Sequence, residues 1–398
     1  MPHLQVAERS HVTEVSGVLP GDDAITTVTL AAGKVSRVDR GPARAASAPT
    51  PSLLCPGFID VQVNGLAGIA FNDPQLSIEQ VVTVTERLWQ VGVALYCPTL
   101  ITDSLENLRR SLAVIARARR QTPAGKSILG VHVEGPYLSP EDGPRGAHPL
   151  THVRTPDWGE FQSLQEAAEG TIRLVTLAPE LPGAIPFIEK LVAAGVCVAI
   201  GHTNATAADI RAAVAAGASM STHLGNAAHD RLQRHHNYVY HQLAADELWA
   251  SLIVDGHHLP PELVKIFVRA KRPDRVILVS DAAHWAGLPP GIYPWGHCDV
   301  EVRADGWIGV VGQPRLAGSG LMLPRGIENV VRFAGVTLSD AVRMVTEQPA
   351  QVLGLAPGIG SISAGSDATF TLADWDADRG CLSIRRTIVN GEVVYQAA

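Results

Sequence analysis

Two histidines, His202 and His223, each stand just after a short apolar run, and this placement could bring their imidazoles together. The runs 196–200 and 218–222 favour strands, and the helix-forming stretch 207–216 lies between them. Neighbouring parallel strands carry their carboxyl ends to the same side, so we expect the two side chains to be neighbours. A single histidine at a strand end is more commonly bonded to a backbone group, but a pair placed in this way indicates metal ligands.

Two carboxylates occupy the same kind of position. Glu134 ends the run 128–133, and Asp281 ends the very apolar run 275–280. With His202 and His223, Glu134 gives three protein ligands and leaves one position open, as expected of a catalytic Zn²⁺ and compatible with Fe²⁺. A charged Asp281 after apolar residues costs desolvation unless it has a task. It could take a proton from water and return it to a leaving amine, or it could cap a following helix.

The elements that must position these residues alternate between strand and helix. The predicted helices include 78–90, 104–119, 186–194, 206–216 and 261–270, with trailing helices at 326–334 and 339–347 and an inserted hairpin at 297–312. Eight apolar strands in alternation with helices predict a (β/α)8 TIM barrel, whose active site lies at the carboxyl ends of the strands. The eight predicted strands are 57–63, 94–98, 128–133, 172–177, 196–200, 218–222, 252–254 and 275–280.

Both ends of the chain differ from this pattern. Short strand-forming pieces occur at 24–30, 34–38, 367–372 and 387–394, and the last contains Asn390-Gly391, a strong hairpin signal. A linker of small residues spans 43–52. Neither end can make a core alone, so both together predict a small β-sandwich domain. The predicted domains are 1–54 plus 359–398 for the small β domain and 55–358 for the barrel.

The composition excludes several classes of protein. The net charge of −7 argues against a nucleic-acid partner, which needs a surplus of Lys and Arg. The five cysteines show no C-x-x-C spacing, which indicates reduced thiols and a cytoplasmic location. No apolar run approaches about 18 residues and no signal-peptide pattern opens the chain, so we expect no membrane partner.

Longer motifs run along the chain from about residue 55 to 355. In these motifs the sequence resembles the N-acetylglucosamine-6-phosphate deacetylase family of the amidohydrolase superfamily. The motifs occur in the family's order: PGFIDVQVNG (56–65), HVEGP (132–136), RGAHP (145–149), APE (178–180), GHTNAT (201–206), THLGNA (222–227), DGHH (255–258), SDA (280–282) and LAGSG (316–320).

The resemblance implies a role for each matching position. Glu134, His202 and His223 would hold the metal, and Asp281 would be the acid and base. The substrate-binding residues that it implies are His148 and His258 at the sugar with Ala147 beside His148, Asn226 and Ala227 near the phosphate, and Leu316, Ala317 and Gly318 lining the sugar pocket. The resemblance also implies a barrel with a small β domain from both termini and a homodimer.

The first strand ends differently from that of family members with two metals. Those members have a His-x-His pair where this chain has Gln62-Val63-Asn64, and carboxamides are poor substitutes for imidazoles. We therefore predict one divalent metal ion per subunit, most simply Zn²⁺, with Fe²⁺ as the alternative. The run 172–177 contains no Lys that could bridge two metals, which argues against the cyclic-amide and nucleobase branches.

Three loops depart from the family pattern. Counting from THLGNA places Arg234 where the family has a phosphate-binding arginine, but its neighbours differ. Arg234 could clamp a phosphate beside His235 or His236, serve another group, or lie in a solvated loop. The segment 140–144 lengthens the loop before His148, and Trp285 replaces a small residue or Pro after the last strand. We expect Trp285 to pack rather than to stack on substrate.

The predicted reaction is hydrolysis of an N-acetyl amide. The expected substrate is the small molecule N-acetylglucosamine 6-phosphate, which would give glucosamine 6-phosphate and acetate. One alternative is a related amidohydrolase that acts on N-acetylgalactosamine 6-phosphate, an unphosphorylated amino sugar or an N-acyl amino acid. The other is a catalytically silent homologue that binds a sugar phosphate.

Overall fold

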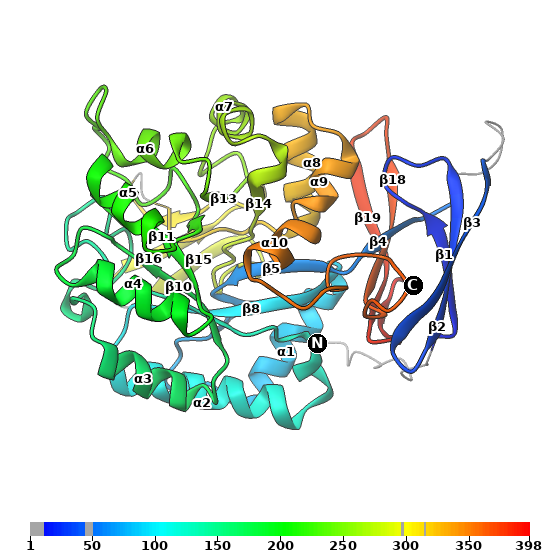
Figure 1. Ribbon diagram of the computed structural model, residues 1–398, viewed down its shortest axis with the longest axis horizontal. Helices are drawn as coiled ribbons and strands as arrows, with labels where there is room; N and C mark the ends of the chain where they lie inside the picture. The colour runs from blue at the N-terminus through cyan, green and yellow to red at the C-terminus, as the bar shows by residue number, and fades with distance from the viewer. Residues whose placement is uncertain (1–11, 44–50, 296–297, 314–315) are drawn as a thin grey trace.

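The centre of the protein is a parallel sheet of eight strands that curls into a barrel inside a ring of helices (Figure 1). The computed structural model describes residues 12–43, 51–295, 298–313 and 316–398. In sequence order the barrel strands are β5 (Phe58–Val63), β8 (Val93–Ile101), β9 (Val131–Glu134), β10 (Ile172–Leu177), β11 (Cys197–Ile200), β12 (Met220–Ser221), β13 (Trp249–Leu252) and β14 (Val276–Leu278). Each strand pairs with its neighbour in the chain, which confirms the predicted (β/α)8 barrel.

The strand β13 lies about three residues before the predicted run 252–254. Its residues Ala250 and Ser251 are weak strand formers, so the sequence placed the strand on the more apolar residues that follow. Pairing overrides that preference, because Ala250 lies opposite Ser221 on one side and opposite Val276 on the other.

The barrel closes between β5 and β14 in two ways. At the carboxyl end, Val63 forms a parallel bridge with Ala282. At the other end, the carbonyls of Met344 and Val345 accept hydrogen bonds from the N–H groups of Leu278 (3.1 Å) and Ile59 (2.7 Å). The predicted helix 339–347 is therefore wrong as one piece. It is two helices, α9 (Leu338–Arg343) and α10 (Glu347–Val352), because the residues between them complete the barrel.

The helices around the barrel are amphipathic and bury one face. In α1 (Ile78–Gln90), Ser77 and Gln80 form a capping box, and Val81, Val84 and Leu88 are buried. The other α-helices are α2 (Leu105–Gln121), α3 (Trp158–Ala167), α4 (Ala184–Ala193), α5 (Ala207–Ala215), α6 (Tyr238–Ala244), α7 (Pro261–Lys271) and α8 (Leu323–Ala334), with short 3₁₀ turns at Pro123–Ser127, Leu150–His152 and Pro273–Arg275. No described helix is both long and apolar enough to cross a membrane.

Both ends of the chain build one further sheet, at the right of Figure 1. Its strands, in spatial order, are β20 (Glu392–Gln396), β19 (Cys381–Val389), β18 (Phe370–Asp376), β4 (Leu53–Pro56), β1 (Glu14–Val18), β2 (Ala24–Ala31) and β3 (Lys34–Ala43). Val28 and Leu30 from one half share a buried core with Leu54, Phe370 and Ile388 from the other. This confirms the separate β domain from both termini, in which a single sheet supplies both sides of the core.

Two predicted local features of this domain can be compared with the structure. Asn390 and Gly391 have φ of 50° and 80° and form the turn between β19 and β20, as the hairpin signal predicted. Most of the expected linker, residues 44–50, lies outside the described residues.

The insertion after β14 is a three-stranded antiparallel sheet rather than a hairpin. It consists of β15 (Gly291–Trp295), β16 (Cys298–Val302) and β17 (Ile308–Val310). The start of the predicted hairpin, His297, lies outside the described residues. Trp295 packs edge-on against Trp285, which is 4% exposed, so Trp285 has the packing role that we expected. A small hairpin of two short strands, β6 (Gly65–Leu66) and β7 (Ile69–Ala70), follows β5.

A substitution at Gly92, just after α1, tests how tightly the barrel packs on the terminal sheet. Its φ is +79°, and a Cβ there would lie 2.8 Å from Thr371 Cγ2 and 2.9 Å from Ile384 Cδ1. We predict that Gly92→Ala lowers the free energy of unfolding by about 2–4 kcal/mol, from backbone strain plus overpacking. Gly195→Ala is the matched control, because Gly195 has φ of +75° and no neighbour within 4 Å of a Cβ. Equal losses in urea denaturation would show that the contact with the sheet adds nothing.

Candidate active site

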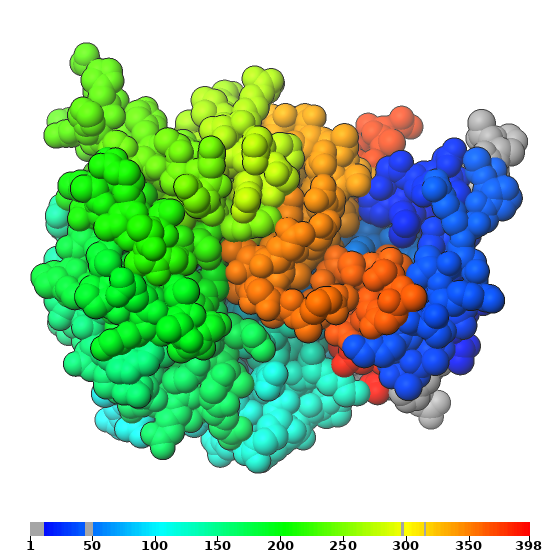
Figure 2. Space-filling view, in the orientation of Figure 1, coloured from blue at the N-terminus to red at the C-terminus, as the bar shows by residue number. Residues whose placement is uncertain are grey.

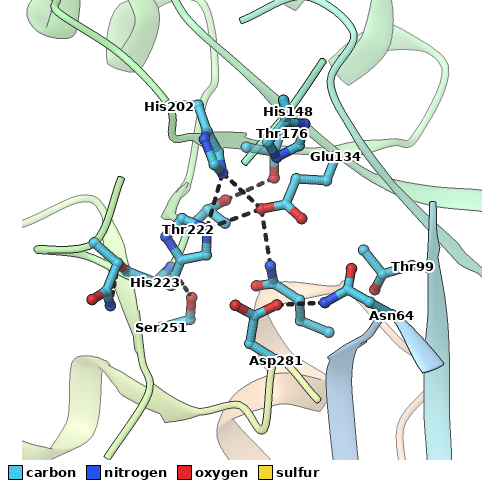
Figure 3. Close-up of polar contacts among 12 residues, drawn as sticks. Asn64, Thr99, Glu134, His148, Thr176, His202, Thr222, His223, Ser251 and Asp281 are labelled. Carbon is cyan, nitrogen blue, oxygen red and sulfur yellow. Dashed lines mark hydrogen bonds and ion pairs between the residues drawn. The ribbon is translucent and has the colours of Figure 1, made fainter. Parts of the chain in front are cut away.

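The three predicted metal ligands meet at the carboxyl end of the barrel (Figure 3). Glu134 is the last residue of β9, and His202 and His223 lie two residues beyond β11 and β12. Glu134 Oε1 lies 3.0 Å from His202 Nε2 and 2.9 Å from His223 Nε2, and the two Nε2 atoms are 3.1 Å apart. All three residues are at most 6% exposed.

The backbone turns sharply where these strands end. His202, His223 and Asp281 have φ of 52°, 30° and 48°, in the left-handed region that side chains with a Cβ rarely adopt. Hydrogen bonds to neighbouring segments hold the two histidines there. The His202 carbonyl accepts from the N–H of Ser139 (2.9 Å), and the His223 N–H donates to Ser251 Oγ (2.7 Å). Such strain at three positions of one site is typical of functional residues.

The arrangement of donors fits a divalent cation. His202 Nδ1 lies 2.9 Å from the carbonyl oxygen of Pro144, which can only accept, so Nδ1 carries a proton and Nε2 is the nitrogen that can present a lone pair to a metal ion. That lone pair, His223 Nε2 and the Glu134 carboxylate face one point, where a positive charge is needed. Ligands of a tetrahedral zinc ion are about 3.3 Å apart, close to the separations found here.

The electrostatics of the site also favour a bound cation. Burial alone would raise the pKa of Glu134, but hydrogen bonds from His202 and His223 and their charges hold it well below its usual range. Burial alone would lower the pKa of His223, yet the hydrogen bond and the charge of Glu134 raise it. Glu134 is therefore an anion stabilised by positive charge on the two imidazoles, and a bound cation would take over that role.

Asp281 lies beside this cluster, and its pKa is shifted in the opposite direction to that of Glu134. Asn64 Nδ2 donates to Asp281 Oδ1 at 2.6 Å (Figure 3). Burial and the nearby Glu134 raise the pKa of Asp281 to about 6. A carboxylate with such a pKa can both accept and release a proton near neutral pH. No helix follows Asp281 in the described stretch 282–290, so the alternative that it caps a helix is wrong.

The two carboxamides at the end of the first strand bond directly to the acidic residues. Gln62 Nε2 donates to Glu134 Oε1 at 3.0 Å, as Asn64 does to Asp281. The sequence analysis treated them only as a missing second metal site and overlooked this role. The signal was available, because residues two apart on a strand point to the same side.

His148 lies against the cluster with one ring nitrogen engaged. Its ring centroid is 4.2 Å from that of His202. The backbone N–H of Thr102 donates to His148 Nδ1 (3.3 Å), and the Thr102 hydroxyl lies 2.8 Å from the same atom. Burial and the nearby His202 hold the pKa of His148 well below its usual range, so the ring is neutral and its proton is on Nε2. Thr102 is a residue that the sequence analysis missed.

Most of the other predicted substrate residues lie around this mouth. His258 is fixed by Asp255, whose carboxylate is 2.7 Å from Nδ1. Asn226 Nδ2 donates to the His223 carbonyl at 3.0 Å. Ser319, next to the predicted segment Leu316, Ala317 and Gly318, donates its N–H to the Asp281 carbonyl at 3.3 Å. Ala227 follows Asn226 with φ of 48°, and Ala147 is exposed beside His148.

Arg234 is the exception. It lies in the exposed loop 230–236, which projects at the upper left of Figures 1 and 2. Among the residues that the structure describes, Arg234 has no hydrogen bond or ion pair. The structure therefore does not bring it into contact with the mouth of its own barrel.

Comparisons with known proteins agree with this geometry. The family model "Amidohydrolase family" matches residues 53–394. An N-acetylglucosamine-6-phosphate deacetylase of Bos taurus is 36% identical over 86% of this chain and 84% of its own. An N-acetylgalactosamine-6-phosphate deacetylase of Escherichia coli O157:H7 is 33% identical over 81% of this chain and 84% of its own.

A solved structure agrees as well. The N-acetyl-D-glucosamine-6-phosphate deacetylase of Mycobacterium smegmatis, in a complex with N-acetyl-D-glucosamine-6-phosphate, superposes with a TM-score of 0.84 and 30% identity. The match covers 97% of this chain and 100% of the other. On the strength of both the sequence and the fold, the chain belongs to the N-acetylglucosamine-6-phosphate deacetylase family of the amidohydrolase superfamily.

Proposed function

We propose that this enzyme hydrolyses N-acetylglucosamine 6-phosphate to glucosamine 6-phosphate and acetate. The observation that carries the proposal is the buried cluster of Glu134, His202 and His223 with Asp281 beside it. Curated relatives with this activity in their names are at least 30% identical over most of the chain. The intact cluster argues against a catalytically silent homologue.

Glu134, His202 and His223 would hold one divalent metal ion per subunit. Two imidazoles and a carboxylate suit Zn²⁺ best, with Fe²⁺ as the alternative. When bound, the ion would supply an acidified water and polarise the amide carbonyl. Gln62 and Asn64 already bond to Glu134 and Asp281, which supports a single metal site.

The residues of the chain would move the protons. Asp281, ionised above its pKa of about 6, accepts a proton from the water that attacks the acetyl carbon. His148, neutral with its proton on Nε2, donates a hydrogen bond to the carbonyl oxygen as negative charge develops there. Protonated Asp281 then gives its proton to the departing amine nitrogen, which leaves acetate and the free amino sugar.

The remaining mouth residues would bind the sugar phosphate. We assign Ala147, His258 and the segment 316–318 to the sugar, and Asn226 and Ala227 to the phosphate side. Because the exposed loop 230–236, which carries Arg234, projects from its own barrel, we propose a homodimer in which Arg234 reaches the phosphate at the mouth of the second copy.

The domain boundaries and the cellular location complete the proposal. We place the barrel domain at 55–358 and the small domain at 1–54 plus 359–398. We also propose a cytoplasmic enzyme, because all five cysteines are free thiols.

A second candidate substrate is N-acetylgalactosamine 6-phosphate. The match to the Escherichia coli enzyme and the unusual neighbours of Arg234 favour it. The two sugars differ only at the hydroxyl on carbon 4, so the same catalytic residues would serve both.

Acetate release from four sugars tests the proposed function. The sugars are N-acetylglucosamine and N-acetylgalactosamine, each with and without the 6-phosphate. We expect kcat/KM to be at least about 100-fold higher for the phosphorylated sugars, because each charged hydrogen bond is worth roughly 1.5–3 kcal/mol. The higher value of the two esters identifies the sugar. Equal turnover with and without phosphate would contradict the phosphate part, and no turnover by metal-loaded protein would contradict the function.

Mixing Arg234→Ala with the inactive variant Asp281→Asn tests whether Arg234 acts across the dimer. Arg234→Ala should raise KM about 10- to 100-fold with little change in kcat, through loss of a phosphate contact. Asp281→Asn should abolish turnover. In a mixed dimer, the subunit with Asp281 receives Arg234 from its partner, so activity at low substrate concentration should rise above that of either variant alone.

The mixing experiment can be interpreted only if the two variants exchange subunits. Subunits must be exchanged by reversible dissociation, and exchange must be verified separately with differently tagged copies. No gain in activity after proven exchange would assign Arg234 to its own subunit or to no substrate contact.

A further inference from the structure

Glu180, in the APE motif (178–180), has no part in the proposed chemistry but bonds to the segment that follows His202. It stands three residues beyond β10, the strand that pairs in parallel with β11. Its Oε1 accepts the backbone N–H of Asn204 at 2.7 Å, and its Oε2 accepts the hydroxyl of Thr203. A residue at the end of one barrel strand therefore holds the turn at the end of the next strand.

The carboxylate of Glu180 has little compensation for its charge. The residue is partly buried, and in the described part of the chain it forms no ion pair. Burial raises its pKa, and the like charge of Asp209 adds to that effect, while the hydrogen bonds from Thr203 and Asn204 oppose it. A carboxylate placed in this way costs free energy, which indicates that its hydrogen bonds have a task.

The start of α5 does not depend on Glu180. Thr206 caps this helix and forms a capping box with Asp209, so the first turn is satisfied by its own residues. The hydrogen bonds to Glu180 come instead from the two residues directly after His202. Glu180 therefore acts on the turn that carries His202 rather than on the helix.

His202 needs such support because its backbone is strained. Its φ of 52° lies in the left-handed region, which a residue with a Cβ rarely adopts. The N–H of Ser139 holds the carbonyl of His202, and Glu180 holds the two residues that follow. These contacts keep the backbone in the conformation that directs the imidazole toward Glu134 (Figure 3).

A second connection runs through the side chain of Asn204. Its Nδ2 donates to both carboxylate oxygens of Glu141 at 3.0 Å. Glu141 lies in the same loop as Pro144, whose carbonyl oxygen is 2.9 Å from His202 Nδ1. Glu180 therefore fixes the backbone beside His202 and, by way of Asn204, the loop that orients its ring.

We propose that Glu180 is a positioning residue for His202 and, through it, for the affinity of the metal site. Glu180 does not belong to the metal cluster; it holds the turn from which His202 presents Nε2. The inference rests on the proposed metal site, of which His202 is one ligand. Residues that orient a metal ligand typically contribute a factor of about 10 to 100 to metal affinity.

Removal of Zn²⁺ from the metal-loaded protein by a chelator of known affinity tests the proposal. Glu180→Ala leaves the N–H of Asn204 and the hydroxyl of Thr203 without their acceptor. We therefore expect the dissociation constant for Zn²⁺ to rise about 10- to 100-fold. Glu180→Gln keeps a carbonyl oxygen for the N–H of Asn204, so its dissociation constant should stay within about threefold of that of wild type.

Glu328→Ala is the matched control for the loss of a carboxylate. The side chain of Glu328 is 11% exposed, and its Oε1 accepts the N–H of Leu382 at 2.8 Å, where α8 meets the terminal sheet. The variant removes the same kind of hydrogen bond away from the metal cluster. Its free energy of unfolding should fall, while its dissociation constant for Zn²⁺ stays within about twofold of that of wild type.

Thr203→Val is a milder variant on the other side of the contact. It removes only the hydroxyl that donates to Glu180. Its dissociation constant for Zn²⁺ should rise as well, and the change should add little to that of Glu180→Ala in the double variant, because both remove one contact.

The outcomes separate this inference from the proposed function. Wild type that binds no Zn²⁺ would overturn the metal site and this inference with it. Three results would overturn the role of Glu180 alone: equal Zn²⁺ affinity in wild type and Glu180→Ala, equal losses in Glu180→Ala and Glu328→Ala, or a loss in Glu180→Gln as large as that in Glu180→Ala. If Glu180→Ala does not fold, unchanged affinity in Thr203→Val would overturn it.

Discussion

The structure depends on one buried anion and the two imidazoles that face it. Glu134 Oε1 lies within 3.0 Å of His202 Nε2 and His223 Nε2, inside a barrel that excludes water from all three. A buried carboxylate is costly unless a positive charge compensates it, and a metal ion can replace the protons that the two imidazoles otherwise carry. The surroundings hold these side chains in place, because the Pro144 carbonyl orients His202 and Gln62 donates to the same oxygen of Glu134. The metal site is thus a consequence of how the strands end.

Below the cluster, a chain of polar side chains crosses the barrel interior. His132 Nε2 lies 2.7 Å from Thr176 Oγ1, which lies 2.7 Å from Thr222 Oγ1 (Figure 3 shows the two threonines). Burial lowers the pKa of His132 to about 4, so this histidine stays neutral. A positive charge there would compete with a metal for Glu134, two residues along the same strand. This hydrogen-bonded chain joins neighbouring strands without placing a positive charge beside Glu134.

The sequence predicted the barrel and the convergence of Glu134, His202, His223 and Asp281 because both follow from local rules. Alternating strands and helices close in one way, and residues at strand ends meet at one face. The groups that orient these residues were not predictable. Thr102 lies far from His148 in the chain, Ser and Thr occur everywhere, and a backbone carbonyl such as that of Pro144 leaves no mark in the sequence. The break between α9 and α10 was missed for a similar reason, since long-range hydrogen bonds to barrel strands produce it. The exposed position of Arg234 depends on a loop whose path has no periodic signal.

The most direct test of the account is the metal content of Glu134→Gln and Asp281→Asn, measured by mass spectrometry after exhaustive dialysis and set beside turnover. The account predicts about one metal ion per chain in wild type and in Asp281→Asn, and little in Glu134→Gln, whose neutral side chain no longer demands a cation. Turnover should be absent in both variants. Wild-type metal content in Glu134→Gln would contradict the claim that the buried anion creates the site, and loss of metal from Asp281→Asn would make Asp281 a ligand rather than the proton carrier.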